Sequence, residues 1–358
     1  MKTRMFLLAA AAGCAQNEVI DIPQTRAIGF DPYVGNTTRA AAKDTDLSAL
    51  QAEGAGFIVL GGYEDSQTYV PVFDGTNETG SHITWNKSSW EYSPINYWLE
   101  GKTYKFVAYA PAKLQEGDLF DIDYAGNKLK MKDGGTFTAD GETDLVVAEG
   151  KPQGYPVAAE PVQMETVGFK FYHALSKVKF TFINGWRNAV TLKITNTKLS
   201  NVKNTGSLTT SGTMAQGSDK IQLSAWSGQT GTADYEDKAD GMNTDEYEAS
   251  YEFENFLLPT VLDDSQMKLT FTVQVTNSQG TSPDLGAGAG NPVNKEVVIP
   301  KDVVTEWMPG YAYNYKLTIS GSTFGLKPIQ FDDIDVDSEW GNGGEDDMDE
   351  GIEVVPGA

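Results

Sequence analysis

Cysteine and histidine are almost absent from this chain of 358 residues, which contains one cysteine, Cys14, and two histidines, His82 and His173. A single cysteine excludes a disulfide within the chain, so the folded part must be stabilised by burial of its core. A zinc site needs clustered histidine and cysteine ligands, and a hydrolytic triad needs a base beside its nucleophile. The sequence has neither that cluster nor a G-x-S-x-G turn. We therefore expect no enzymatic activity and no cofactor, and we interpret His173 as a packed structural residue and His82 as a surface residue.

Positive charge is also scarce. Lysine and arginine number 27 against 50 aspartates and glutamates, which gives a net charge of −23. Binding to nucleic acid needs clustered cations, and so does a polybasic membrane surface. We therefore exclude a nucleic-acid partner and interpret most of the carboxylates as a solvated acidic surface that keeps an exposed protein soluble.

The acidic residues do not form a recognisable calcium loop. Residues 333–337, Asp-Ile-Asp-Val-Asp, have the acid spacing that opens an EF-hand loop. Ser338 stands at the sixth position, where that loop needs glycine, and Gly344 stands at the twelfth, where it needs a bidentate glutamate. We therefore predict no bound metal.

Long apolar runs are missing except near the start, where residues 5–13 follow two cations, Lys2 and Arg4. This pattern is typical of a secretory signal peptide, and it is far shorter than the ~20 apolar residues of a membrane-spanning helix. Cys14 stands where the signal would be cleaved, which indicates a bacterial lipoprotein acylated at Cys14. Residues 11–13, just before this cysteine, resemble a lipobox, the cleavage motif of lipoprotein signals. Ala11 stands at the position of this motif where leucine is commonest. The alternative is a buried structural cysteine that happens to lie near the start.

Helical periodicity is almost absent, and the chain reads mainly as short strands. Four stretches alternate apolar and polar residues with a period of two, which is typical of sheets with one buried face. Two such sheets facing each other form a sandwich. One short helix is expected over residues 46–52. The alternating stretches are residues 178–183, 190–195, 267–276 and 311–319, and further strands are expected at 57–60, 69–73, 103–111 and 144–148.

The order of these stretches indicates a tandem organisation. A first strand over residues 28–34 is limited to a sheet edge, because Pro32 cannot donate to a ladder. Polar stretches at 200–220, 227–248 and 277–292 are expected to be surface loops. We divide the chain into a signal peptide (1–13), a lipidated N-terminal segment with a removable strand (14–39), an N-terminal β-sandwich (40–162), a C-terminal β-sandwich (163–340) and an acidic tail (341–358).

Several motifs together resemble one protein family. Residues 169–180, FKFYHALSKVKF, contain a run that resembles the F-x-H-A-L-S-K-V signature of the fimbrillin family, the type V pilins and related adhesins of Bacteroides-type bacteria. Residues 307–315 are similar to the family's W-x-x-G-x-x-Y-x-Y run, and residues 328–340 resemble its closing I-x-F and V-x-x-W strand. Residues 56–60 are similar to the start of its N-terminal domain. The resemblance covers most of the chain.

The resemblance implies an all-β protein of two transthyretin-like β-sandwich domains in tandem, without enzymatic activity. It implies a structural or adhesive subunit of a cell-surface fimbria, whose lipoprotein precursor reaches the outer membrane. An arginine-specific protease then removes the N-terminal strand, and the vacated groove accepts a strand from another fimbrial subunit. This route is physically sensible, because a removed edge strand leaves unpaired backbone groups and an apolar groove. Stalk, anchor and tip roles all remain open.

Two arginines are candidates for the cut. Arg39 follows the strand at 28–34, so cleavage there would release that strand with the lipid, and we predict Arg39 as the site. Arg26 is the alternative, and cleavage there would release only the tether. The donor strand is expected from the C-terminus, where Ile352, Val354 and Val355 supply a short apolar run.

An aromatic stretch supports a second reading of the sequence. Trp85, Trp90 and Trp98 fall within residues 82–100 and could stack on sugars, although packing between strands is the favoured interpretation. The alternative function is accordingly a monomeric outer-membrane lipoprotein that binds a glycan or another host or bacterial surface ligand through these rings.

Overall fold

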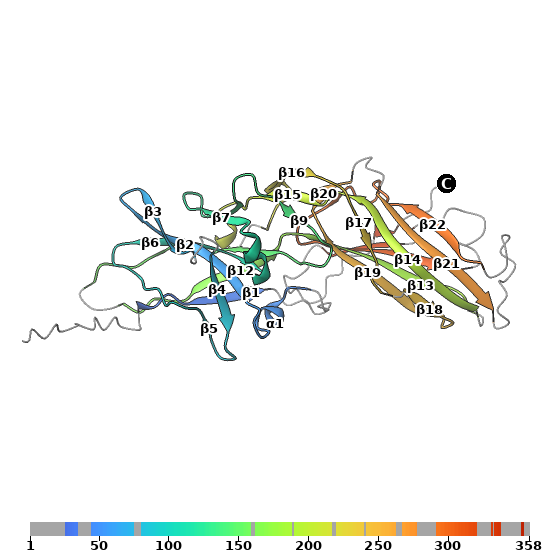
Figure 1. The fold of residues 1–358 in the computed structure, drawn as a ribbon, viewed down its shortest axis with the longest axis horizontal. Helices are drawn as coiled ribbons and strands as arrows, with labels where there is room; N and C mark the ends of the chain where they lie inside the picture. The colour runs from blue at the N-terminus through green and yellow to red at the C-terminus, as the bar shows by residue number, and fades with distance from the viewer. Residues whose placement is uncertain are drawn as a thin grey trace, which may run out of the picture.

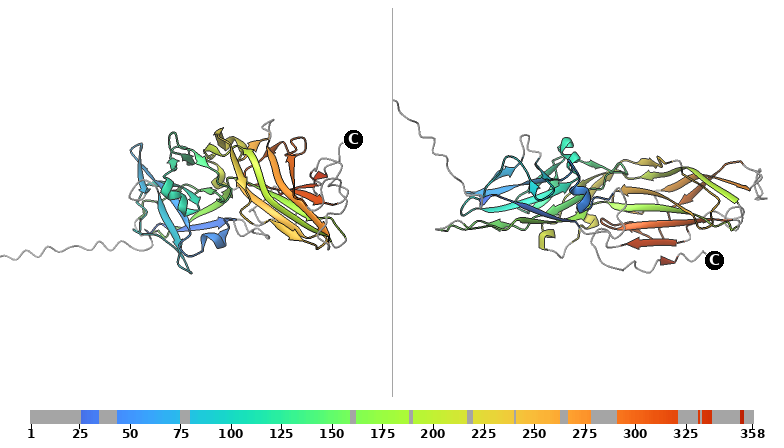
Figure 2. Two further views of the ribbon diagram at one scale, coloured as in Figure 1. Left: turned by 45° about the vertical axis from the view of Figure 1, so that its right-hand side comes forward. Right: turned by 90° about the horizontal axis from the view of Figure 1, so that it is seen from below.

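The computed structural model describes residues 26–34, 44–74, 80–158, 162–187, 190–216, 220–239, 241–262, 267–277, 291–320, 331, 333–337 and 352–353. Strands dominate these residues, which confirms the predicted all-β class. The two halves of the chain lie end to end along the long axis (Figure 1), and two further directions show the same arrangement (Figure 2). Within the described residues, no helix is both long enough and apolar enough to cross a membrane.

The first half is built on one sheet whose strands run in the order β1-β12-β10-β6-β2-β4-β5. β3 pairs with β2, and β11 pairs with β6. The proline-containing strand β1 lies at the edge, as Pro32 predicted. The strands are β1 (Phe30–Val34), β2 (Phe57–Asp65), β3 (Thr68–Phe73), β4 (Ser81–Trp85), β5 (Trp90–Glu91), β6 (Thr103–Ala110), β10 (Val146–Glu149), β11 (Gln153–Gly154) and β12 (Val167–His173).

Both faces of this first sheet are buried. Along β2, Phe57 and Val59 enter one core and Ile58 and Leu60 enter the other, which explains the continuous apolar run. A short helix, α1 (Leu47–Leu50), packs Leu50 against the first of these cores. The other core is shared with β7 (Phe120–Asp123), β8 (Lys128–Met131), β9 (Phe137–Thr138), β15 (Thr205–Leu208) and β16 (Trp226–Thr230).

The second half is a sandwich of two sheets around one core, as the alternating strands predicted. One sheet has the order β19-β13-β24-β25-β26, and the other has the order β17-β14-β21-β22 with β18 beside β14. A short pair, β20 (Thr260–Val261) and β23 (Glu306–Trp307), lies outside both. The sandwich strands are β13 (Ser176–Asn184), β14 (Val190–Val202), β17 (Ala233–Glu236), β18 (Met242–Thr244), β19 (Ser250–Leu257), β21 (Lys268–Asn277), β22 (Val293–Val298), β24 (Ala312–Ile319), β25 (Asp333–Asp337) and β26 (Ile352–Glu353).

The change from one half to the other occurs later than the predicted boundary at residue 162. β12 pairs antiparallel with β10 and belongs to the first sheet, whereas β13 begins only two residues after β12 and belongs to the second half. Ala174 and Leu175 therefore form the connection, and both are fully buried. Composition could not show this, because both strands are rich in buried apolar residues and the difference lies in their pairing partners.

Two further expectations need correction. The stretches 200–220 and 227–248 are not plain surface loops, because they contain β15, β17 and β18 and most of β16. These strands are short and polar, and single buried anchors such as Leu208 and Tyr235 hold them. The apolar run at residues 69–73 also predicts a buried strand, but β3 is mostly half-exposed, and Phe73 is its one buried residue.

Candidate functional site

The edge strand β1 lies parallel to β12, with register running from Phe30 opposite Val167 to Val34 opposite Phe171. Its pairing continues before the strand, where Val167 donates its N–H to the carbonyl of Gly29 at 2.8 Å. Parallel strands normally need a long crossover, and here the crossover spans most of the first half of the chain. β1 is therefore placed by tertiary contacts rather than by neighbours in sequence.

The segment before β1 is also held on its other side. The N–H of Ile28 donates to the carbonyl of Asn96 at 2.9 Å, and the N–H of Trp98 donates to the carbonyl of Arg26 at 2.8 Å. The hydroxyl of Tyr92 donates to the carbonyl of Ile28 at 2.7 Å. Residues 26–28 thus have backbone partners beyond the β12 edge.

Alternate side chains of this segment enter an apolar groove. Ile28 and Phe30 are 2% and 4% exposed, whereas Tyr33 is 51% exposed. The ring of Phe30 lies 5.0–5.8 Å from four other rings, those of Phe73, Tyr92, Phe106 and Phe169. An aromatic pair in this range contributes about 0.5–1.5 kcal/mol beyond its buried area. The sequence predicts that Ile28, Phe30 and Val34 share one face of this strand, and the burial of Ile28 and Phe30 confirms it for these two residues.

Arg26 is fixed at the start of this segment. Its guanidinium donates to Glu100 Oε1 at 2.6 Å and lies 5.3 Å from the centre of the Tyr155 ring. Cys14 and Arg39, the predicted lipidation and cleavage sites, lie outside the described residues.

The three tryptophans do not form one exposed surface. Trp98 is 1% exposed and packs edge-on against Tyr104 at 4.9 Å, so the prediction of a sugar-stacking role is wrong for this residue. Trp90 packs against Phe57 at 5.2 Å and against Trp85 at 5.2 Å, and both tryptophans are half-buried on the β4–β5 hairpin. Packing, the favoured interpretation, accounts for these rings.

A buried charge cluster lies where the two halves meet. Lys177 of β13 places its Nζ 2.7 and 3.0 Å from the two carboxylate oxygens of Asp44, and 3.3 Å from Glu254 Oε2. Asp44 and Lys177 are 5% and 7% exposed. Burial raises the pKa of the Glu254 carboxyl above its ordinary value; the charge of Lys177 opposes that shift, and the charge of Asp44 adds to it.

A second part of the same junction fixes the backbone next to Asp44. Thr45 donates its N–H to Asp144 Oδ2 at 2.7 Å and its hydroxyl to the Asp144 carbonyl at 3.0 Å. His173 Nδ1 lies 3.0 Å from Asp144 Oδ1, which confirms His173 as a packed, hydrogen-bonded structural residue. The prediction of His82 as a surface residue is wrong. His82 is half-buried in β4, and its Nε2 lies 2.5 Å from the Ala55 carbonyl oxygen.

A family model described as fimbrillin-like matches residues 38–331. The chain belongs to the fimbrillin-like family. This membership confirms the resemblance carried by the motifs at 169–180 and 307–315. No functionally curated protein matches the sequence.

Solved structures similar to this fimbrillin-like chain include three fimbrial proteins. A fimbrial protein from Bacteroides vulgatus is 17% identical with a TM-score of 0.51, covering 87% of this chain and 98% of its own. A fimbrial assembly protein from Parabacteroides distasonis is 11% identical with a TM-score of 0.40, covering 87% and 95%. The fimbrial anchor protein Mfa2 from Porphyromonas gingivalis is 11% identical with a TM-score of 0.35, covering 87% and 97%. At these identities the likeness concerns the fold alone.

The fimbrillin-like chain places its C-terminal segment on its own second half. β26 pairs antiparallel with β25, with Ile352 opposite Ile334 and Glu353 opposite Asp333. Val354 and Val355, the other predicted donor residues, lie outside the described residues. The segment 333–337 is a strand whose carboxylates pair with Lys316 at 3.1 and 2.6 Å. Among the described residues, no group of three or more histidine, cysteine, aspartate or glutamate side chains could hold a metal ion.

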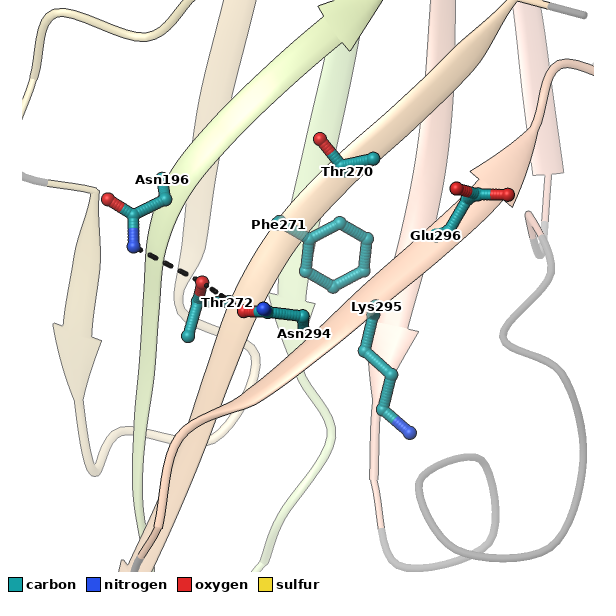
Figure 3. A pocket seen from close by; sticks show the side chains of 7 residues that line it. All are labelled: Asn196, Thr270, Phe271, Thr272, Asn294, Lys295 and Glu296. Carbon is teal, nitrogen blue, oxygen red and sulfur yellow. Dashed lines mark hydrogen bonds between the residues drawn. The ribbon is translucent and has the colours of Figure 1, made fainter.

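A shallow hollow lies on the outer face of β14, β21 and β22 (Figure 3). Asn196, at the bulge in β14, donates its side-chain amide to the Thr272 hydroxyl at 3.2 Å, and that hydroxyl donates to Asn294 Oδ1 at 2.9 Å. These groups thus bond one another, and Phe271, the one aromatic residue of the lining, is 2% exposed. The hollow has neither paired carboxylates nor a free ring for a sugar. Its lining residues are Asn196, Thr270, Phe271, Thr272, Asn294, Lys295 and Glu296.

Sequence reasoning found β1, its buried face and the structural role of His173. It missed the charge cluster, because Asp44 and Lys177 are 133 positions apart and no local spacing connects them. The available signal was Lys177 itself, which follows Ala174, Leu175 and Ser176 in the HALSKV run and has its side chain buried in β13.

Proposed function

We propose that this chain is a structural or adhesive subunit of a cell-surface fimbria. Its precursor is a lipoprotein anchored in the outer membrane through Cys14, and its partners are other fimbrial subunits. Assembly follows proteolytic trimming: an arginine-specific protease cuts the N-terminal segment, β1 leaves, and a strand of another subunit takes its place. Family membership and the fold of the edge strand support this function.

The observation that carries the proposal is the way in which β1 is bound at the edge of the first sheet. The strand contributes only backbone pairing to β12 and a row of side chains to an apolar groove, and it lies at the sheet edge. Its loss would leave β12 with an unpaired edge beside the open pocket of Phe30. Such an edge is a ready template for strand addition, where main-chain hydrogen bonds give affinity and side-chain pockets give specificity.

The contacts of Arg26 argue against it as the cut site and so support Arg39. Proteolysis needs an exposed segment that can enter a protease. Arg26 is held by an ion pair with Glu100, by the ring of Tyr155 and by a backbone bond to Trp98. Cleavage there would also leave β1 in its groove.

The C-terminal segment has a side-chain pattern that suits this groove. Residues 28–32 read Ile-x-Phe-x-Pro, and residues 352–356 read Ile-x-Val-x-Pro. The buried positions of β1 thus recur with the same spacing in the predicted donor. Because a donated strand fills the groove of a different molecule, the contact does not close on itself and generates a filament.

Arg39→Ala tests the proposal. Wild-type protein treated with an arginine-specific protease should lose residues up to Arg39 and form ladders that resist denaturant on gels, whereas Arg39→Ala should stay monomeric. The matched control is Arg26→Ala, which should trim and assemble like the wild type. A trimmed wild-type protein that remains monomeric at high concentration would refute the stalk-like assembly.

A further inference from the structure

Lys177 has an environment unlike that of its neighbour on the same strand. Lys179 pairs with Glu252 at 2.8 Å, and their side chains are 25% and 54% exposed. Lys177 faces two carboxyl groups, Asp44 and Glu254, and the three side chains are 9%, 1% and 13% exposed. A buried ion pair costs desolvation energy that its mutual attraction barely offsets, so stability alone is a weak reason for such a cluster.

All three groups are carried by fixed backbone. β13 lies between β19 and β24, with Lys177 opposite Phe256 on one side and Ala312 on the other. Glu254 stands two residues from Phe256 in β19, so it is the diagonal neighbour of Lys177 on the same face. Asp44 is placed from the other direction by the bonds between Thr45 and Asp144 described above. The folded backbone therefore holds the amine of Lys177 and the carboxyl group of Asp44 in contact, and no further conformational change is needed to bring them together.

We propose that Lys177 and Asp44 condense into an intramolecular isopeptide bond, with Glu254 as the catalytic acid and base. The chemistry requires a buried amine, a carboxyl group in contact with it and a neighbouring acid that can move protons, and the cluster supplies one of each. Holding two reacting groups at contact distance is worth an effective concentration of up to about 10⁵–10⁸ M in favourable cases. This reaction is separate from strand exchange and does not depend on it.

The step balances without any added reagent. Lys177 passes a proton to the Asp44 carboxylate, which gives a neutral amine and a neutral acid. Rotation of the carboxyl group about its Cβ–Cγ bond turns its face to the nitrogen, whose lone pair forms the C–N bond at Cγ. Protonated Glu254 gives its proton to the departing hydroxyl and accepts a proton from the nitrogen, so the C–O bond breaks and one water leaves. Glu254 ends as it began, and no atom is oxidised or reduced.

Burial favours both the start and the end of this reaction. The raised pKa of Glu254 keeps this carboxyl protonated over a wider pH range, which a proton donor needs. The product amide is neutral, so two charges disappear from a site that pays for their desolvation.

Mass spectrometry of the full-length chain carrying Cys14→Ser, which prevents lipidation, tests the bond. The denatured protein should weigh one water molecule less than its sequence mass. A tryptic digest should locate the loss in a branched product, in which residues 171–179 are joined to the peptide that begins at Asp44. Folded wild-type protein with the full sequence mass and two separate peptides would overturn the proposal.

Conservative variants separate the chemistry from folding. Lys177→Arg keeps the positive charge but removes the amine, and Glu254→Gln keeps the shape but removes the acid, so both should have the full sequence mass. The matched control is Glu252→Gln on the same strand, which should retain the bond. Circular dichroism would establish that each variant is folded. Bond formation in folded Glu254→Gln at the wild-type rate would reject the role of Glu254.

Discussion

Phe30→Ala tests how strongly the sheet retains the edge strand β1, separately from how the trimmed protein assembles. The variant removes a ring that is 4% exposed and touches four other aromatic rings. Truncation of a buried phenylalanine costs about 3–5 kcal/mol. Because β1 is an edge strand that can shift into the space left behind, we expect the lower end, about 3 kcal/mol. A change of this size is about 100-fold in an equilibrium constant.

Two measurements read out this loss. In the uncut protein, urea denaturation should show a lower free energy of unfolding by the amount given above. After cleavage at Arg39 the strand is held only by noncovalent contacts, and a labelled strand should leave the Phe30→Ala protein about 100-fold faster, because affinity changes of this kind fall mainly on the dissociation rate. Once the strand has gone, variant and wild type are the same molecule from Ala40 onward. Their final polymers should therefore be identical.

Tyr33→Ala is the matched control for this experiment. Tyr33 lies on the same strand but is 51% exposed, and surface substitutions usually change stability by within about 0.5 kcal/mol. Equal release rates for the two variants would refute the groove as the feature that retains β1. A difference in the final polymers would show that residues before Ala40 are still present in the assembled subunit.

Two further predictions concern the core beside this groove. Trp98→Ala should lower the free energy of unfolding by about 3–5 kcal/mol, because its ring is enclosed in the core. Trp85 is half-buried, so Trp85→Ala should lower the free energy of unfolding by less than half as much. Equal losses for the two variants in urea denaturation would contradict these placements. Burial raises the pKa of Tyr104 from 10.0 to about 12, so the unfolded chain releases this proton first as the pH rises. The stability that Tyr104 contributes is thus complete below pH 10 and is lost between pH 10 and about 12. Tyr104→Phe should flatten the decline in urea midpoints across that window, and an unchanged slope would reject this assignment.

The parts of the fold that could be predicted are those that produce a pattern within a short stretch of sequence. β21 and β24 bury alternate residues along their whole length, and a period of two is visible without any partner strand. Pro32 predicted that β1 lies at an edge, because a proline has no N–H to donate to a neighbouring strand and is therefore excluded from the middle of a sheet. The unpredicted strands, such as β17 and β18, are short and polar, and they exist because β14 offers them an edge.

The candidate site divides in the same way. The apolar face of β1 could be predicted from Ile28 and Phe30 alone, but its ring contacts come from three other strands and one loop. The charge cluster joins residues before the first sheet to β13 and β19, so only the completed fold brings them together. The burial of Trp98 was equally hidden, since an aromatic run looks the same in a core and on a surface.

Arg39 lies between two segments that the fold retains by different means. Before it, β1 is held by backbone pairing and apolar packing, which another strand of similar pattern can reproduce. After it, Asp44 and Thr45 are tied to buried charges that no incoming strand supplies. An amide between Asp44 and Lys177 would close a loop of 133 residues, and a cross-link over such a loop stabilises by about 5 kcal/mol in the chain-entropy model. A cut at Arg39 would then empty the groove while the new start of the chain stays in place, so the trimmed subunit could survive with an open edge until a donor arrives.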